Sequence, residues 1–85
     1  MHRLSSTEYQ FMELIWQHSE GISSGEIYDL FPQSLSTKST ILSRILKKGC
    51  AICKRKGKQV YYYPNITKRE YEKLILQEDI EKNMG

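Results

Sequence analysis

The chain has 85 residues, of which 39% are hydrophobic, and a formal net charge of +3. A chain of this length forms one small domain with a single core and has no room for a second catalytic lobe. No apolar run approaches the roughly 20 residues of a membrane helix and no signal peptide is recognisable, so we expect a cytoplasmic protein without a membrane partner. Two cysteines, Cys50 and Cys53, are too few for a disulfide framework, and we expect both to be reduced.

The charges are unevenly distributed along the chain. From Leu30 to Arg69 there is no Asp or Glu, whereas ten Lys or Arg residues occur there. All ten carboxylates lie outside this acid-free window. A charge distribution of this kind favours a polyanionic partner.

The first helix is predicted by a capping box, Ser5-Ser6-Thr7-Glu8, in which the serine oxygen accepts a helix N–H and the glutamate reaches back to the cap. The apolar residues that follow fall on one broad face, which indicates a heavily buried helix. These residues are Tyr9, Phe11, Met12, Ile15 and Trp16. We expect the helix to end at Glu20-Gly21.

A second capping box, Ser23-x-x-Glu26, predicts a short second helix. Its apolar positions are Ile27, Leu30 and Phe31, spaced i, i+3 and i+4. Pro32 cannot continue the helix, because its ring removes a backbone donor and clashes with the preceding turn. A short polar loop is expected after it.

The third helix is expected from about Ser36 to Lys48, with Gly49 as its C-terminal stop. Its residues divide by angle into two faces. The apolar stripe consists of Ile41, Leu42, Ile45 and Leu46. The opposite face consists of Ser36, Thr40, Ser43 and Lys47, flanked by Thr37, Ser39 and Arg44. Because this polar face has small hydrogen-bonding groups and long cations but no carboxylate, the helix is suited to a close approach to DNA.

Two short β-prone runs follow, Cys50 to Lys54 and Gln59 to Tyr63. Arg55-Lys56-Gly57-Lys58 is predicted to form the hairpin turn between them, with Gly57 at positive φ. Alternation along the second run directs Tyr62 towards the core, and Pro64 ends the pairing. The tip of the hairpin is therefore cationic.

A third capping box, Thr67-x-x-Glu70, starts a last helix that we expect to run to the chain end near Asn83. This helix has two apolar patches. One comprises Tyr71, Leu74 and Ile75. The other comprises Leu76 and Ile80. The first patch can seat on its own domain, whereas the second needs a partner, so we predict that it serves dimerisation.

These elements predict a mainly α fold with a small β-hairpin, in the α+β class. Three compact helices followed by a basic hairpin form the winged helix-turn-helix, in which the third helix enters the major groove and the hairpin touches the flanking backbone. We assign residues 1–66 to this DNA-binding domain. Residues 67–85 are expected to form a C-terminal helix that begins a truncated dimerisation region.

Five segments in register carry a family resemblance. They are Met12 to Trp16, Ser23 to Ile27, Thr37 to Gly49, Gly57 to Pro64 and Lys68 to Tyr71. In order, they resemble the penicillinase-repressor family of bacterial winged-helix regulators, the BlaI/MecI/CopY type. The resemblance implies a dimeric transcriptional repressor that binds inverted-repeat operators of the TACA/TGTA kind. It also implies dimerisation helices past position 85 and, in two branches, a proteolytic cleavage region or a Cys-rich metal tail.

One position departs from the family pattern. Where the family usually has an aliphatic residue in the first turn of the groove helix, this chain has Lys38, at the edge of the apolar stripe. We expect its side chain to extend towards solvent or a phosphate. Operator preference would then differ from that of the family.

Two groups of residues are predicted to contact DNA. On the groove helix, Thr40 and Ser43 are expected at base edges with Arg44 and Lys47 beside them, since hydroxyls pair with either kind of base and cations with guanine. The wing cations are expected to contact phosphates without reading sequence. The full predicted set is Ser36, Thr37, Lys38, Ser39, Thr40, Ser43, Arg44, Lys47, Lys54, Arg55, Lys56 and Lys58. The alternative for both groups is a merely solvated surface.

Other functions have less support. No base and nucleophile pair, Gly-rich phosphate loop or carboxylate cluster indicates an enzyme, and no cofactor is expected. A metal- or thiol-responsive sensor could use Cys50 and Cys53, but a three-residue step along a strand directs the two thiols to opposite faces, and only His2 and His18 could complete a metal site. Base stacking on the Tyr61-Tyr62-Tyr63 run and docking of an acidic protein partner are further alternatives.

The expected partners are double-stranded DNA and, on DNA, a second copy of the chain. Because few residues follow the patch formed by Leu76 and Ile80, we expect the 85-residue chain to be monomeric or only weakly dimeric in free solution. Two DNA half-sites would then bring two copies together.

Overall fold

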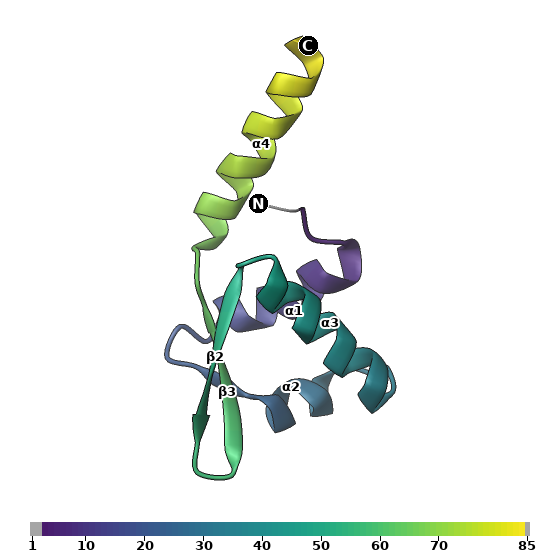
Figure 1. The fold of residues 1–85 in the computed structure, drawn as a ribbon, viewed down its shortest axis with the longest axis vertical. Helices are drawn as coiled ribbons and strands as arrows, with labels where there is room; N and C mark the ends of the chain where they lie inside the picture. Colours follow the sequence, from purple (N-terminus) through teal and green to yellow (C-terminus); the bar gives the residue numbers. More distant parts are fainter. Residues whose placement is uncertain (1–2, 85) are drawn as a thin grey trace.

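The computed structural model describes residues 3–84, with side chains in the last helix described as far as Glu78. Within these residues the chain forms α1 (Ser6–Trp16), β1 (Ile22–Ser23), α2 (Ser24–Leu30), α3 (Leu35–Lys47), β2 (Ala51–Lys56), β3 (Gln59–Pro64) and α4 (Lys68–Met84). The strands form an antiparallel sheet in the order β1-β3-β2. This is the expected α+β winged helix. The hairpin of β2 and β3 lies at one end of the long axis and α4 at the other (Figure 1).

Side-chain caps start the helices where local spacing places them. Ser5 Oγ accepts the Glu8 N–H at 3.2 Å while the Ser5 N–H donates to Glu8 Oε1 at 3.0 Å, so the first capping box is confirmed. Thr67 and Glu70 exchange the same pair of hydrogen bonds, at 2.8 and 3.0 Å. Ser23 Oγ caps α2 by accepting a backbone N–H from the first turn of that helix.

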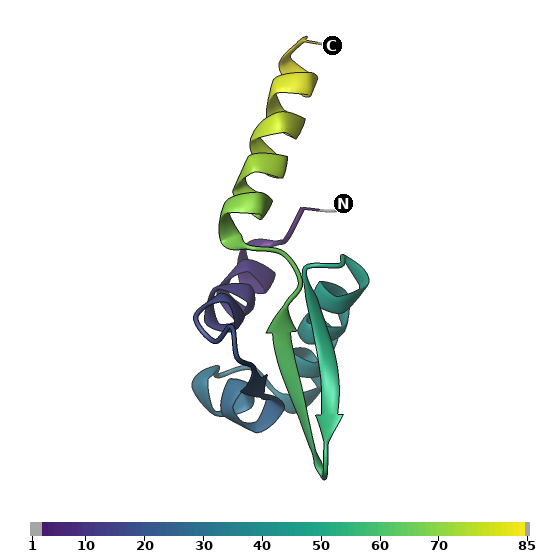
Figure 2. The ribbon, with the colours of Figure 1, turned by 90° about the vertical axis from the view of Figure 1, so that its left-hand side faces the viewer.

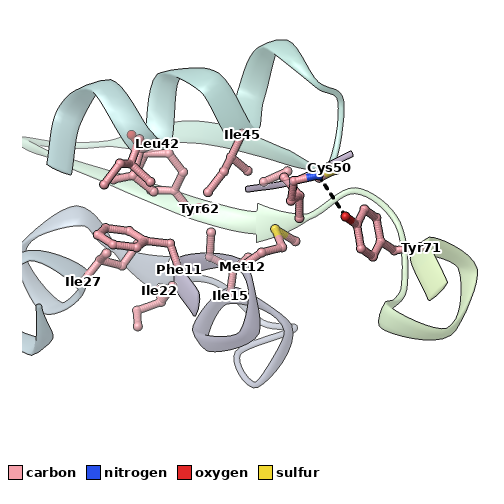
Figure 3. Packing of buried hydrophobic residues seen from close by; sticks show 13 residues of the cluster. Phe11, Met12, Ile15, Ile22, Ile27, Leu42, Ile45, Cys50, Tyr62 and Tyr71 are labelled. Atoms are coloured by element: carbon pink, nitrogen blue, oxygen red, sulfur yellow. Dashed lines mark hydrogen bonds between the residues drawn. The ribbon is translucent and has the colours of Figure 1, made fainter. Parts of the chain in front are cut away.

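The core lies between α1, α3 and the sheet (Figure 3). Its fully buried side chains are Phe11, Met12, Ile15, Ile22, Ile27, Leu42, Ile45 and Cys50. Tyr62 of β3 is also buried, as the alternation predicts. Burying an apolar side chain of this size contributes about 1.5–3 kcal/mol. Each of these residues therefore accounts for a large part of the small net stability of such a domain.

The end of α1 and the strand after it differ from the prediction. α1 ends at Trp16 rather than at Glu20-Gly21, and tight turns follow. Gly21, in the last of these turns, has a φ of 106°, which favours glycine. The turns lead into β1, which is not predicted from the sequence. β1 pairs with β3 on the side away from β2, with Ile22 opposite Tyr62.

The end of α2 corrects a second expectation. Leu30 is 61% exposed, so its assignment to the apolar face is wrong. Phe31 is extended, with φ −123° and ψ 143°, because Pro32 disfavours a helical conformation in the residue before it. Turned out of the helix, the Phe31 ring stacks on the ring of Phe11 with centroids 3.9 Å apart. Phe31 therefore reaches the core from the turn.

The hairpin has longer strands and a shorter turn than predicted. β2 continues to Lys56 and β3 begins at Gln59, so the turn is Gly57-Lys58 and not four residues. Gly57 has the predicted positive φ, 62°. A two-residue turn with positive φ matches the twist of the strands, which explains why pairing extends to the tip. Arg55 and Lys56 are consequently strand residues.

α4 packs on the rest of the domain through its first turns. Tyr71 is buried, and its hydroxyl accepts the Leu4 N–H at 2.8 Å (dashed line in Figure 3). Its ring centroid lies 5.8 Å from that of Trp16, whose indole N–H donates to Ile66 O at 2.9 Å. Beyond these contacts α4 projects away from the other elements (Figures 1 and 2).

A buried ion pair ties α1 to the end of α3. Glu8 Oε1 lies 2.5 Å from Lys48 Nζ, and the two side chains are 4% and 21% exposed. Lys48 Nζ also donates to Arg3 O at 3.0 Å. Burial raises the pKa of Glu8, but the hydrogen bonds from Lys48 and from the Ser5 N–H outweigh burial and hold this pKa below its ordinary value.

Glu8→Gln should lower the free energy of unfolding at pH 7 by about 1–3 kcal/mol, because it leaves Lys48 without its charged partner. The pKa of Glu8 is lower in the folded chain, so its contribution is present above the unfolded pKa, about 4.3, and is lost as the pH falls through the folded pKa. Urea unfolding should show a large difference from wild type at pH 7 and a smaller one at about pH 3. Glu72→Gln, at an exposed position of α4, is the control. The same difference at both pH values would contradict this account.

Gly21→Ala should destabilise the domain by about 1–3 kcal/mol. A Cβ at Gly21 would lie 2.5 Å from Cε2 of Tyr63, and the positive φ there disfavours an L side chain. Gly25→Ala, in α2 with open space around it, is the matched control and should be neutral or stabilising by up to about 1 kcal/mol. Thermal unfolding compares the two variants, and equal melting temperatures would refute the prediction.

Candidate nucleic-acid interface

The polar face of α3 points outwards. Its exposed residues are Ser36, Thr37, Ser39, Thr40, Ser43, Arg44 and Lys47. The opposite stripe is turned to the core, with Ile41, Leu42 and Ile45 buried. The exposed face of α3 thus has hydroxyls and cations and no carboxylate.

Hydrogen bonds orient the hydroxyls at the start of α3. Ser34, which the sequence analysis does not single out, is the N-cap: its Oγ accepts the Thr37 N–H at 3.3 Å and donates to Thr37 Oγ1 at 2.9 Å. One turn later, Thr40 Oγ1 donates to Ser36 O at 3.0 Å. Because this bond uses the Thr40 hydroxyl proton, the oxygen of Thr40 is left to act as an acceptor towards solvent.

Two shallow hollows adjoin this helix. One, of about 300 Å³, is lined by Ser36, Thr37, Thr40, Ile41 and Arg44. The other, of about 590 Å³, is lined by Ser5, Glu8, Arg44, Lys47 and Lys48. Arg44 lines both, so the cationic surface continues from the middle of α3 to its C-terminal end.

The wing cations are exposed and rest on tyrosine rings. Lys56 Nζ lies 5.4 Å from the ring centroid of Tyr61 and 5.7 Å from that of Tyr63, and Lys54 Nζ lies 5.6 Å from that of Tyr63. A hydrogen bond with the Tyr63 side chain raises the pKa of Lys56 above its ordinary value. Arg55 and Lys58 are exposed on the same hairpin. The tyrosines therefore support the cations, and these contacts occupy ring faces that base stacking would need.

The groove helix and the wing lie on the same half of the molecule. In Figure 2, α3 and the hairpin occupy one half, and α1 and α2 occupy the other. Elements that are separate in the sequence thus lie on the same half of the molecule in this view. We call this surface, formed by the polar face of α3 and the cations of β2, the turn and β3, the basic face.

Lys38 does not belong to the basic face. It is only 7% exposed, and its Nζ donates to Tyr28 O at 2.6 Å and to Phe31 O at 3.0 Å. The prediction that this side chain extends towards solvent or a phosphate is wrong. Its ammonium finds acceptors at the C-terminal end of α2, where helix carbonyls lack intrahelical partners.

Leu35 is a residue of this region that the sequence analysis misses. It is the first residue of α3 and is 67% exposed. The signal that could have found it is the cap, because Ser34 as the N-cap makes Leu35 the first residue of the helix. An exposed apolar side chain at the start of a groove helix is suited to contact with a thymine methyl group.

The two cysteines lie in different environments. Cys50 is fully buried before β2, whereas Cys53 is exposed in β2. Burial raises the pKa of the Cys50 thiol, which disfavours the reactive thiolate. Among the described residues, no group of three or more His, Cys, Asp or Glu side chains could hold a metal ion. His2 lies outside the described residues.

Within residues 3–84, no helix combines the length and the apolar character needed to cross a membrane.

The predicted dimerisation patch is described in part. Leu76 is 61% exposed on α4, whereas Ile80 lies outside the residues whose side chains the structure describes.

Three packed helices followed by a basic hairpin define the winged helix-turn-helix class. The family model of the penicillinase repressor matches residues 4–85, and the chain belongs to this family. The penicillinase repressor of Bacillus licheniformis is 32% identical over 72 residues, which cover 81% of this chain and 56% of that protein. The chain thus spans little more than half the length of the curated relative that it matches. The resemblance drawn from the five sequence segments is confirmed.

Proposed function

We propose that this chain is a transcriptional repressor that binds double-stranded DNA sequence-specifically at an inverted-repeat operator. The observation that carries the proposal is the basic face, where a helix surface without carboxylates and a cationic hairpin lie on the same half of the molecule. Membership of the penicillinase repressor family supports it. In this arrangement α3 lies in the major groove and the hairpin follows the flanking backbone.

Base readout is assigned to α3. Thr40 accepts hydrogen bonds from exocyclic amino groups of adenine or cytosine, because its own proton is bound to Ser36 O. Arg44 and Lys47 pair with guanine acceptors, and Leu35 contacts a thymine methyl group. Ser36, Thr37, Ser39 and Ser43 complete this surface. Lys38 is no longer part of it.

Phosphate contact is assigned to the wing. The exposed cations of the hairpin are Lys54, Arg55, Lys56 and Lys58. Cations that contact phosphates position a protein on DNA but carry no sequence information. Each neutralised phosphate releases counterions, so binding should weaken steeply with salt.

Arg44→Ala should reduce the preference for operator over scrambled duplex by about 1–3 kcal/mol, whereas Lys56→Ala should weaken both duplexes about equally. Lys56→Ala should also lower the slope of log affinity against log salt by about 0.9, because one phosphate contact is lost. Fluorescence anisotropy with both duplexes over a salt series measures these quantities, with Lys73→Ala on α4 as the control.

Identical behaviour of Arg44→Ala and Lys56→Ala would show that the division of roles is wrong. If the wild type were indifferent to both salt and sequence, the proposed function itself would fail.

We infer that the outer part of α4 contacts a second copy on DNA, so that residues 67–85 begin a dimerisation region. Leu76 borders an apolar groove of about 690 Å³ that Tyr9, Tyr71 and Ile75 also line. Ile80 is assigned to the same contact from its sequence position. An inverted repeat presents two half-sites, which would hold two copies in a symmetric arrangement.

Leu76→Ala should reduce cooperative binding to DNA, because burial of a leucine at a contact contributes about 1.5–3 kcal/mol. The affinity for a duplex with two half-sites, divided by that for one half-site, should fall about tenfold or more. Leu30→Ala is the matched control, since Leu30 is also 61% exposed but lies on α2, and the ratio cancels any effect on a single site. An unchanged ratio for Leu76→Ala would exclude Leu76 from the dimer contact.

A further inference from the structure

The C-terminal end of α2 needs partners from elsewhere in the chain. α2 has only 7 residues, and a helix this short has little stability of its own. Its last carbonyls lack intrahelical donors. Lys38 Nζ supplies donors to Tyr28 O and Phe31 O, and a cation at this end also interacts favourably with the helix dipole. Nζ lies 5.6 Å from the Tyr28 ring centroid as well.

Lys38 connects this end of α2 to the first turn of α3. Its backbone N–H donates to Ser34 O at 2.9 Å, while its side chain bonds back to α2. The residue therefore holds both sides of the connection formed by residues 31–34. Phe31, in the same connection, is stacked on Phe11 of α1. An aliphatic side chain at position 38 would fill the space but would leave the carbonyls of Tyr28 and Phe31 without these donors.

We propose that Lys38 is a positioning residue for DNA recognition, which fixes the orientation of α3 relative to α2 without touching DNA. The inference rests on the proposed DNA-binding function. Base readout by short hydroxyl side chains requires close placement of the helix, because Ser and Thr have little reach. The residues affected are those of the first turns of α3, Ser36, Thr37 and Thr40, which lie beside the turn that Lys38 holds.

Two other roles would give different measurements. A phosphate contact by Lys38 would add to counterion release, so its loss would lower the salt dependence and weaken all DNA alike. A purely structural role would change only the stability of the fold and would leave the operator preference of the folded protein unchanged. A positioning role changes the preference and leaves the salt dependence unchanged.

Lys38→Met tests the inference, because it keeps a long side chain and removes the donors. Below the unfolding temperature of the variant, affinity for the operator duplex should fall about tenfold, while affinity for a scrambled duplex and the salt slope should stay as in wild type. Lys58→Met is the control: the same substitution at an exposed wing position removes a cation assigned to phosphate contact, so it should lower the salt slope and weaken both duplexes about equally.

A second measurement needs no variant. In wild-type protein, the ammonium protons of Lys38 should exchange slowly with water by NMR and remain slow when the operator is added, since they are buried on carbonyls. Fast exchange in the free protein, or unchanged operator preference in folded Lys38→Met, would overturn the inference. If wild type bound neither duplex, the proposed DNA-binding function would fail as well. That result is distinct from an unchanged operator preference in Lys38→Met, which would overturn only the positioning role.

Discussion

The buried face of α1 is the surface on which the rest of the domain depends. α3 and β3 pack directly on α1, Phe31 of the turn before α3 stacks on Phe11, and the ring of Tyr71 in α4 lies beside Trp16. A chain of 85 residues buries only about 60% of its unfolded surface, so one apolar face must serve several elements. α3 and the wing strand β3 are therefore both positioned by their packing on α1.

The cations of the acid-free window divide into internal and external groups. Lys38 is bonded to the end of α2 and Lys48 to Glu8, whereas Lys68 and Arg69 are exposed at the start of α4. The exposed remainder on the basic face comprises Arg44, Lys47, Lys54, Arg55, Lys56 and Lys58. Because the carboxylates lie on other elements, the net charge of +3 understates the field on this face. The internal cations contribute to the fold, and the external ones are available to a polyanion.

Local spacing predicts most of the fold, and long-range contacts account for what it misses. A capping box joins residues three apart, so Ser5 with Glu8 and Thr67 with Glu70 could be read directly. β1 has two residues and acquires its strand geometry only from β3, far along the chain. The direction of the Lys38 side chain, towards the protein interior, likewise depends on the carbonyls of Tyr28 and Phe31 at the end of α2. In the candidate site, the polar face of α3 follows from angular position alone, whereas the direction of each side chain on it does not.

Hydroxyl groups read bases poorly unless their direction is fixed, since Ser and Thr both donate and accept. In this chain the proton of Thr40 is held by Ser36 O, and the hydroxyls of Ser34 and Thr37 are bonded to each other. These bonds make the oxygen of Thr40 a directional acceptor before any DNA is present. Under the proposed function, the wing contributes affinity with little selectivity, because phosphate contacts carry no sequence information. Selectivity is then assigned to α3, with the hydroxyls in its first turns and Arg44 and Lys47 in its last, so a change of helix orientation alters every base contact.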